Sequence, residues 1–215
     1  MSSKMHGCPV IIPPVGLEGE LQLPAEARSV VVFAHGSGSS RFSKRNRYVA
    51  SELHRSGLGT LLMDLLTARE EQVDVQTRHL RFDIGLLASR LLDAVAWLRQ
   101  APATSSLSIG IFGASTGGGA ALVAAAEWPQ DIAAVVSRGG RPDLAGASLP
   151  RVQAPTLLIV GGSDEAVIEL NEKAYEQMVC VRRLEIVPGA THLFEEPGTL
   201  EAVAALAAGW FQRYL

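Results

Sequence analysis

The chain has 215 residues, of which 47% are hydrophobic and 19% are charged, and its net charge is −3 at pH 7. This length and composition predict a single globular domain, 1–215, and exclude a disordered or fibrous chain. The small negative charge gives no reason to expect binding to nucleic acid or to a membrane. Two cysteines make no disulfide framework, and the first residues lack the apolar segment of a signal peptide, so we expect a cytoplasmic protein.

The first part of the chain predicts an antiparallel hairpin at one edge of a sheet. Two short segments with strand character, 9–14 and 19–24, flank a turn rich in proline and glycine. The next run, 29–34, is apolar throughout, as expected for a strand buried on both faces. It ends in His35-Gly36-Ser37-Gly38.

Strand and helix patterns then alternate to the end of the chain. The six apolar runs that predict parallel strands are 29–34, 59–63, 109–112, 132–136, 155–160 and 184–187. The segments that predict helices are 44–55, 83–99, 120–126, 167–177 and 198–214, whereas 67–79 is a polar excursion and 137–154 reads as a loop rather than a helical cap. This alternation predicts an α/β fold with a mostly parallel sheet of about eight strands, the N-terminal hairpin included, with helices on both faces and no large lid.

A G-x-S-x-G motif, Gly113-Ala114-Ser115-Thr116-Gly117, joins the 109–112 strand to an apolar helix. In a strand-to-helix turn this tight, the glycines are needed because a Cβ atom would collide with the neighbouring strand and helix. The turn would expose the Ser115 hydroxyl at a helix N-terminus, which favours developing negative charge. The motif alone is common, and tight packing at a helix start would explain it equally well.

Other strand ends give the motif a chemical context. In an open parallel sheet, functional residues gather at the carboxyl edge, where Ser115, Asp164 and His192 each follow a predicted strand. Their order along the chain is the one expected of a hydrolase on such a sheet. Ser115 would attack an acyl carbon, His192 would act as its base, and Asp164 would hold the His192 ring in the right tautomer. The backbone N–H groups of Ser37 and Thr116 would form the oxyanion hole.

With these motifs in place, the chain resembles an α/β-hydrolase of the small, lid-poor dienelactone hydrolase-like branch. The resemblance runs from about Val30 to the C-terminus and rests on 35–38, on 113–117, and on 189–194 following 161–164. The namesake enzymes of that branch have a cysteine at the turn where this chain has Ser115. The serine puts lactone specificity in doubt and favours a serine esterase mechanism.

Several of these residues have alternative interpretations. Glu165 and Asp143 compete with Asp164 for the role of the acid, although only Asp164 ends the strand between the serine motif and the histidine. His192 could be an ordinary surface histidine. His35 is better explained as a structural residue whose ring fixes the oxyanion loop than as a base.

Arginines follow two of the loops that should border the site. Arg41, together with Arg45 and Arg47, follows the oxyanion loop, whereas Arg138 and Arg141 follow the strand after the serine motif. We predict that Arg41, Arg138 and Arg141 bind an anionic group of the substrate, because a guanidinium matches such a group. Solvated ion pairs with Asp83 or Asp143 would explain these arginines equally well.

The sequence therefore predicts a serine hydrolase that cleaves a small carboxylic ester, thioester or lactone through an acyl-enzyme on Ser115, with no cofactor and no metal. The alternatives are a non-catalytic binding protein of the same fold, and another enzyme on that fold, such as a cofactor-free peroxidase or an acyl transferase. We expect a small-molecule acyl substrate as partner, and the sequence leaves a homodimer open.

Overall fold

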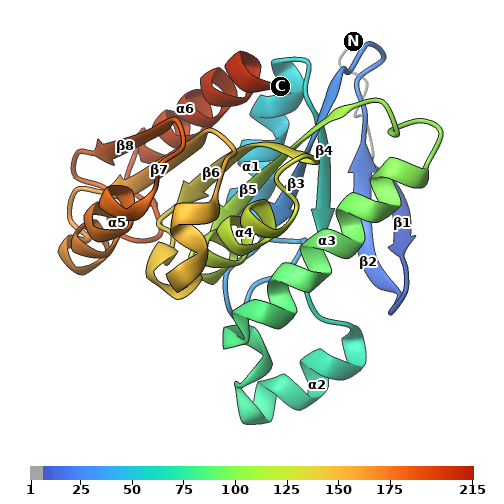
Figure 1. Cartoon of the computed structure of the whole chain (residues 1–215), viewed down its shortest axis with the longest axis horizontal. Coiled ribbons are helices and arrows are strands. Elements are labelled where there is room, and N and C mark those ends of the chain that lie inside the picture. The colour runs from blue at the N-terminus through green and yellow to red at the C-terminus, as the bar shows by residue number, and fades with distance from the viewer. Residues whose placement is uncertain (1–6) are drawn as a thin grey trace.

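Eight strands form one sheet in the order β1-β2-β4-β3-β5-β6-β7-β8 in the computed structural model, which describes residues 7–215 (Figure 1). The strands are β1 (Cys8–Ile12), β2 (Leu17–Gln22), β3 (Ser29–Ala34), β4 (Gly59–Met63), β5 (Ser108–Ala114), β6 (Ile132–Arg138), β7 (Thr156–Gly161) and β8 (Arg182–Val187). The helices are α1 (Lys44–Arg55), α2 (Ala68–Thr77), α3 (Ile84–Gln100), α4 (Thr116–Glu127), α5 (Glu165–Gln177) and α6 (Thr199–Tyr214), with 3₁₀ segments η1 (Leu80–Phe82) and η2 (Pro142–Arg151).

The sheet is mostly parallel, as predicted. β1 pairs with β2, and β2 with β4, in antiparallel register, so the N-terminal hairpin forms one edge. The remaining neighbours, from β4 through β3, β5, β6 and β7 to β8, are all parallel. Parallel neighbours bring the carboxyl ends of these strands to the same edge of the sheet, which is where the candidate site residues lie.

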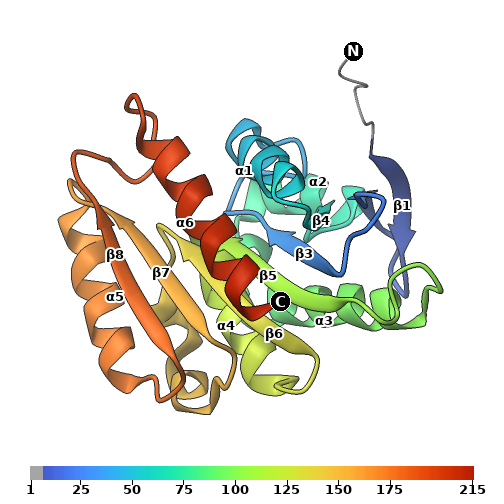
Figure 2. The ribbon, with the colours of Figure 1, turned by 90° about the horizontal axis from the view of Figure 1, so that it is seen from above.

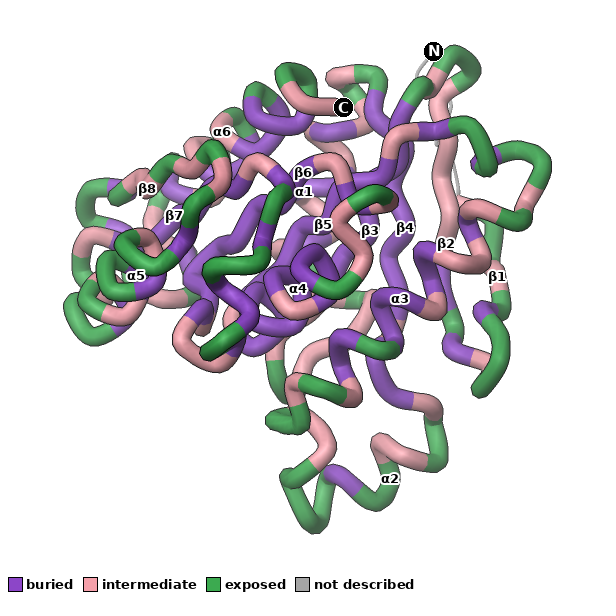
Figure 3. Tube along the Cα trace, viewed as in Figure 1, coloured by how far each residue is buried: buried purple, intermediate pink, exposed green. Residues whose placement is uncertain are grey.

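The position of strand β3 in the sheet explains why all of its central residues are apolar. Val30 and Val32 point to the face covered by α3 and α4, whereas Val31 and Phe33 point to the face covered by α1 and α6. Figure 2 shows α6 crossing one face of the sheet, and Figure 3 shows that the central strands are buried along their length. A strand buried on both faces has no position for a polar side chain, so the alternation of an exposed strand is lost.

Several elements begin or end a few residues from their predicted bounds, and three of the differences affect the carboxyl side of the sheet or the loops around it. The segment 67–79, which the sequence indicated only as polar, contains helix α2, and this helix projects beyond the carboxyl edge of the sheet (Figure 1). The helix starts with a capping box. The Thr67 hydroxyl accepts a hydrogen bond from the Glu70 N–H, and the Glu70 carboxylate accepts one from the Thr67 N–H. Strand β6 runs two residues further than predicted, to Arg138, because it pairs with β5 and β7 up to that residue. The predicted loop 137–154 contains the short 3₁₀ segment η2, which packs against α4 and α5.

No large lid lies over the carboxyl edge of the sheet in the described chain, as the sequence predicted. Between residues 7 and 215, no helix combines the length and the apolar character needed to cross a bilayer.

Candidate active site

Ser115 occupies a strained turn between β5 and α4. Its φ and ψ angles are 52° and −122°, in a region that residues with a side chain rarely adopt. The surrounding structure holds this conformation, because the Ser115 N–H donates to the Arg138 carbonyl and the Ser115 carbonyl accepts from the N–H groups of Gly118 and Arg141. The serine is therefore fixed at the carboxyl edge of the sheet and at the N-terminus of α4, where the helix dipole favours negative charge.

The two glycines of the motif allow this turn to pack against its neighbours. A Cβ atom on Gly117 would lie 2.3 Å from the Ala34 carbonyl oxygen, and one on Gly113 would lie 2.5 Å from the Gly117 carbonyl oxygen. Both distances are far below van der Waals contact, and both obstacles are backbone atoms that cannot rotate away. The close approach of β3, β5 and α4 explains why glycine is required two residues before and two residues after Ser115.

Asp164 follows β7 and His192 follows β8, and the two side chains are in direct contact. Asp164 ends the turn after β7 and is the N-cap residue of α5, and His192 lies in the loop between β8 and α6. The His192 Nδ1 and the Asp164 Oδ2 are 2.7 Å apart. Since a carboxylate can only accept, the proton of this hydrogen bond lies on Nδ1, which leaves Nε2 of a neutral His192 available as a base.

The alternative acids are placed elsewhere. Asp143 forms a two-pronged ion pair with Arg141, with both N–O distances between 2.7 and 2.8 Å. Glu165 is exposed on the first turn of α5. Among the carboxylates of the described chain, only Asp164 is hydrogen-bonded to His192.

Ser115 and His192 line the same cavity, whose volume is about 240 Å³. The remaining lining residues come from the loop after β3, the start of α1, the ends of β5 and β6, and the loop between β8 and α6: Gly36, Ser37, Ser39, Ser43, Arg45, Asn46, Ala114, Arg138 and Leu193. No hydrogen bond joins the Ser115 hydroxyl to His192 within residues 7–215. In unliganded sites such a contact is often long and tightens when substrate binds.

The backbone N–H groups of Ser37 and Thr116, the predicted oxyanion donors, have no acceptor among the described residues. Thr116 is the first residue of α4, so its N–H has no intrahelical acceptor. Ser37 lies in the loop after β3 and lines the cavity. Neither N–H donates a hydrogen bond to another residue of the described chain.

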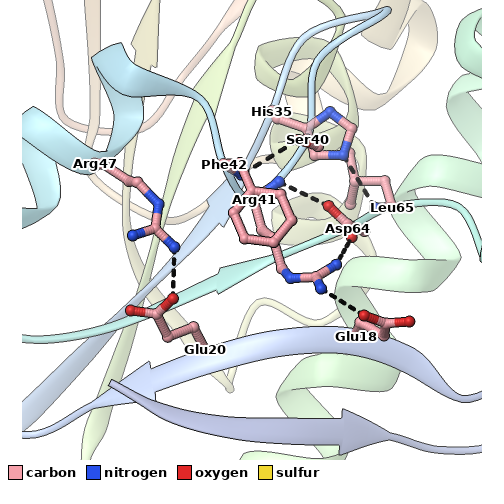
Figure 4. Close-up of polar contacts among 9 residues, drawn as sticks. All are labelled: Glu18, Glu20, His35, Ser40, Arg41, Phe42, Arg47, Asp64 and Leu65. Carbon is pink, nitrogen blue, oxygen red and sulfur yellow. Dashed lines mark hydrogen bonds and ion pairs between the residues drawn. The ribbon is translucent and has the colours of Figure 1, made fainter. Parts of the chain in front are cut away.

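His35 fixes the oxyanion loop to the loop after β4 (Figure 4). Its Nδ1 donates to the Gly36 carbonyl at 2.9 Å, and its Nε2 accepts from the Leu65 N–H at 3.1 Å. This arrangement requires a neutral ring, because a proton on Nε2 would face the Leu65 N–H. Burial of the ring is the main cause that lowers the pKa of His35 below its ordinary value of 6.5. The ring therefore has the structural role that the sequence suggested.

The His35 contacts predict a pH dependence of stability. Because the folded-state pKa lies below the unfolded value, the unfolded chain binds the proton more readily, so the contribution of His35 is complete above about pH 6.5 and is lost as the pH falls below it. We expect His35→Gln to cost about 1 kcal/mol at neutral pH and to flatten the fall in stability between pH 7 and 5, measured by urea unfolding.

A matched control for this prediction is the exposed His79, whose ring is hydrogen-bonded to the hydroxyl of Thr77. The variant His79→Gln should keep the wild-type pH profile. Burial also lowers the pKa of His54, so the double variant His35→Gln/His54→Gln should be flatter than either single one. If the free energy of unfolding of His35→Gln fell between pH 7 and 5 as steeply as that of the wild type, the assigned state of the His35 ring would be wrong.

The structure separates the three arginines that the sequence grouped together. Arg41 is held by Asp64 and Glu18 (Figure 4), and it borders a neighbouring cavity of about 510 Å³ rather than the one at Ser115. Arg141 is paired with Asp143. Arg138 alone of the three lines the cavity that contains Ser115 and His192.

Sequence reasoning missed Gly139 as part of the site. Its φ is 50°, and a Cβ atom there would lie 3.5 Å from the His192 ring and 3.3 Å from the His192 carbonyl oxygen. Gly139 thus turns the chain at the end of β6 and lies against the His192 ring. The glycine pair 139–140 at a strand end was a visible signal, but its contact with His192 depends on the position of a loop fifty residues away.

Comparisons with known proteins agree with this geometry. The sequence model of the "Dienelactone hydrolase family" matches residues 17–215. The crystal structure of a dienelactone hydrolase from Anabaena variabilis ATCC 29413 is similar with a TM-score of 0.95 and 62% sequence identity, over 98% of this chain and 97% of that one. Est1E from Butyrivibrio proteoclasticus shares the fold, with a TM-score of 0.79 and 18% identity over 96% of this chain and 98% of its own.

Two curated relatives from Mycobacterium tuberculosis, strains CDC 1551 / Oshkosh and ATCC 25618 / H37Rv, are each 59% identical over 206 residues, and both are named "Putative phosphoribosyl transferase". The match covers 96% of this chain but only 46% of each relative, so the chain spans less than half of their length. The family match covers nearly the whole of the present chain, including the serine turn and the strand ends that carry Asp164 and His192. The chain belongs to the dienelactone hydrolase family and has the α/β-hydrolase fold of that family.

Proposed function

We propose that the chain is a serine hydrolase that cleaves a small carboxylic ester, thioester or lactone through an acyl-enzyme on Ser115. The observation that carries the proposal is the 2.7 Å contact between His192 and Asp164 in a site where His192 and the strained Ser115 share one cavity. A hydroxyl is a weak nucleophile near neutral pH unless a base removes its proton, and a base held in one tautomer by a carboxylate is suited to that task.

The reaction follows from the proposed roles. Nε2 of His192 takes the proton of the Ser115 hydroxyl as its oxygen attacks the acyl carbon, and Asp164 stabilises the imidazolium that forms. The backbone N–H groups of Thr116 and Ser37 bind the oxyanion of the tetrahedral intermediate. His192 then protonates the leaving alcohol or thiol, and a water molecule activated by the same histidine hydrolyses the acyl-enzyme.

A turnover panel tests this proposal directly. Short-chain aryl esters, an acyl thioester and a simple lactone would be supplied to the purified chain, and the initial rates compared with those of Ser115→Ala. We expect turnover of at least one class that is lost in the variant. Absence of turnover for every class, together with no covalent labelling by a fluorophosphonate, would instead favour a non-catalytic member of the fold.

The name of the mycobacterial relatives, which refers to phosphoribosyl transfer, is compatible with this proposal. Those relatives match the present chain over 46% of their own length, and the present chain matches the dienelactone hydrolase family over residues 17–215. We therefore assign phosphoribosyl transfer to the part of those relatives that lies outside the match. Release of pyrophosphate from phosphoribosyl pyrophosphate by the present chain, in the presence of a nucleobase, would contradict that assignment.

The cavity predicts a preference for short acyl chains. Only Ala114 and Leu193 contribute apolar side chains to its lining, and no lid adds further apolar surface. A buried methylene stabilises a complex by ~0.8 kcal/mol, and here there is little surface to bury one against. We expect kcat/KM to fall or stay level from acetyl to decanoyl esters, with no activation at an oil–water interface. A kcat/KM that rises steadily with chain length would contradict this prediction.

A further inference from the structure

Arg138 is a buried cation without an anionic partner. It is the last residue of β6, its exposed fraction is 7%, and its side chain lines the cavity shared by Ser115 and His192. Its Nε is buried without a hydrogen-bond partner. Within residues 7–215, its guanidinium forms no ion pair and no hydrogen bond.

Comparable arginines of the chain are paired. Arg41 contacts Asp64 and Glu18, Arg81 contacts the fully buried Asp74, and Arg90, 10% exposed, contacts Glu70. A buried charge is costly unless a partner compensates it, so an arginine that is buried beside the nucleophile and left unpaired needs an explanation. Within residues 7–215, the guanidinium of Arg138 has one aromatic contact, with its carbon 5.7 Å from the centre of the Phe194 ring, and this contact leaves its N–H donors unused.

A second cation, Arg45, faces the same cavity from the first turn of α1. Its NH1 group contacts the exposed Glu195 at 2.8 Å, and its Nε is buried without a partner. Burial and the nearby charge of Arg45 lower the pKa of Arg138 to about 10, so the Arg138 side chain remains charged near neutral pH. Two guanidinium groups thus border the cavity, and in the described chain the only carboxylate that pairs with either of them is that of Glu195, which is 64% exposed and does not line the cavity.

We propose that Arg138 and Arg45 bind an anionic oxygen group of the substrate, a carboxylate or a phosphate, next to the acyl carbon that Ser115 attacks. The inference rests on the proposed function, since it names the class of substrate for that site. A guanidinium fork matches the two oxygens of either group, and the desolvated position of Arg138 strengthens the contact because water competes little there. The anion would supply the partner that the protein does not provide.

The test compares esters that differ only in terminal charge. Monomethyl glutarate, its terminal amide and the corresponding terminal phosphonate have similar shapes, and only the amide is neutral. We expect the wild type to prefer an anionic ester over the amide by at least 10-fold in kcat/KM. Arg138→Gln should reduce that ratio by about 10- to 100-fold, which corresponds to the loss of a charged hydrogen bond. The preferred anion distinguishes a carboxylate from a phosphate-bearing substrate.

Two further variants separate recognition from general damage. Arg138→Lys keeps the positive charge but loses the two parallel N–H donors of the guanidinium. Its ratio of kcat/KM for the anionic ester to kcat/KM for the amide should therefore lie between those of the wild type and Arg138→Gln. Arg141→Gln is the matched control, because that arginine pairs with Asp143 and lies outside the cavity lining, and its ratio should equal that of the wild type. A wild-type ratio near one, or a ratio that Arg138→Gln leaves unchanged, would overturn the proposal.

Anion binding measured in the absence of an ester separates the proposed anion site from the proposed hydrolase activity. Inorganic phosphate and glutarate would be titrated calorimetrically into the wild type, Arg45→Gln and Arg138→Gln, with unfolding curves to establish that each variant is folded. We expect binding of at least one anion that weakens 10-fold or more in each variant. Arg138-dependent binding without turnover of any ester would refute the proposed hydrolase and keep the anion site. Turnover of neutral esters without such binding would refute the anion site and keep the hydrolase.

Discussion

Ser115→Ala is expected to abolish covalent labelling by a fluorophosphonate and to lower kcat by several orders of magnitude, on the order of 10⁶ by the serine-protease precedent. The reason is that the strained turn presents only this hydroxyl to the cavity beside His192 and two free N–H donors. Labelling followed by peptide mass spectrometry, together with ester turnover, provides the measurement. The alanine should be accommodated in the turn, because the contacts that hold it there are made by the backbone.

Ser39→Ala provides a matched control for this substitution. Ser39 lines the same cavity but lies in the oxyanion loop, away from the turn between β5 and α4. Its variant should still be labelled at Ser115. If Ser115→Ala is labelled at the wild-type rate, another residue is the nucleophile and the proposed mechanism is wrong.

Asp164→Asn is expected to lower kcat on the order of 10⁴-fold while the fold is retained, again by analogy with serine proteases. The carboxylate accepts the hydrogen bond from Nδ1 of His192. An asparagine can present its N–H group instead, which would place the proton on Nε2 and remove the base from the Ser115 hydroxyl. Turnover and a thermal unfolding curve of the same preparation separate the loss of the tautomer from the loss of the fold.

Asp143→Asn is the comparison for the acid. This carboxylate pairs with Arg141 at a partly exposed position, so its removal should affect activity little and stability by no more than about 1 kcal/mol. A large loss of turnover in Asp143→Asn, together with a mild effect of Asp164→Asn, would exchange the roles of the two residues.

Sequence patterning predicted the elements whose environment is uniform. Strand β3 is buried on both faces, so its apolar run was easy to recognise, and the predicted range 29–34 is the observed one. Helix α1 was also predicted at its observed bounds, and Ser56-Gly57 marked its end. Helix α2 was missed because its residues are mostly polar and exposed. Its signal was the Thr67 and Glu70 capping box rather than a hydrophobic period.

The ion-pair partners of the arginines could not be predicted from sequence patterns. The sequence offered Arg41, Arg138 and Arg141 as equivalent candidates because each follows a strand that ends at the same edge. Their pairing depends on residues distant in the chain: Asp64 and Glu18 lie 23 positions from Arg41 in either direction. The observed strand β6, longer than predicted, includes Arg138 and places it beside Ser115, whereas Arg141 lies beyond the turn.

By itself, the sequence determined the α/β fold, the order along the chain of the strands and of the helices other than α2, and Ser115, Asp164 and His192 as the residues to test. These depend on local patterns: apolar runs, helix ends, and a glycine motif whose position at a strand end, in chain order with Asp164 and His192, indicated its role. The tertiary structure alone decided that Asp164 rather than Asp143 contacts His192, that Gly139 supports the ring, and that Arg138 is buried without a counterion. Such contacts join strand ends that are far apart in the chain, and no local pattern records which side chains meet when parallel strands align.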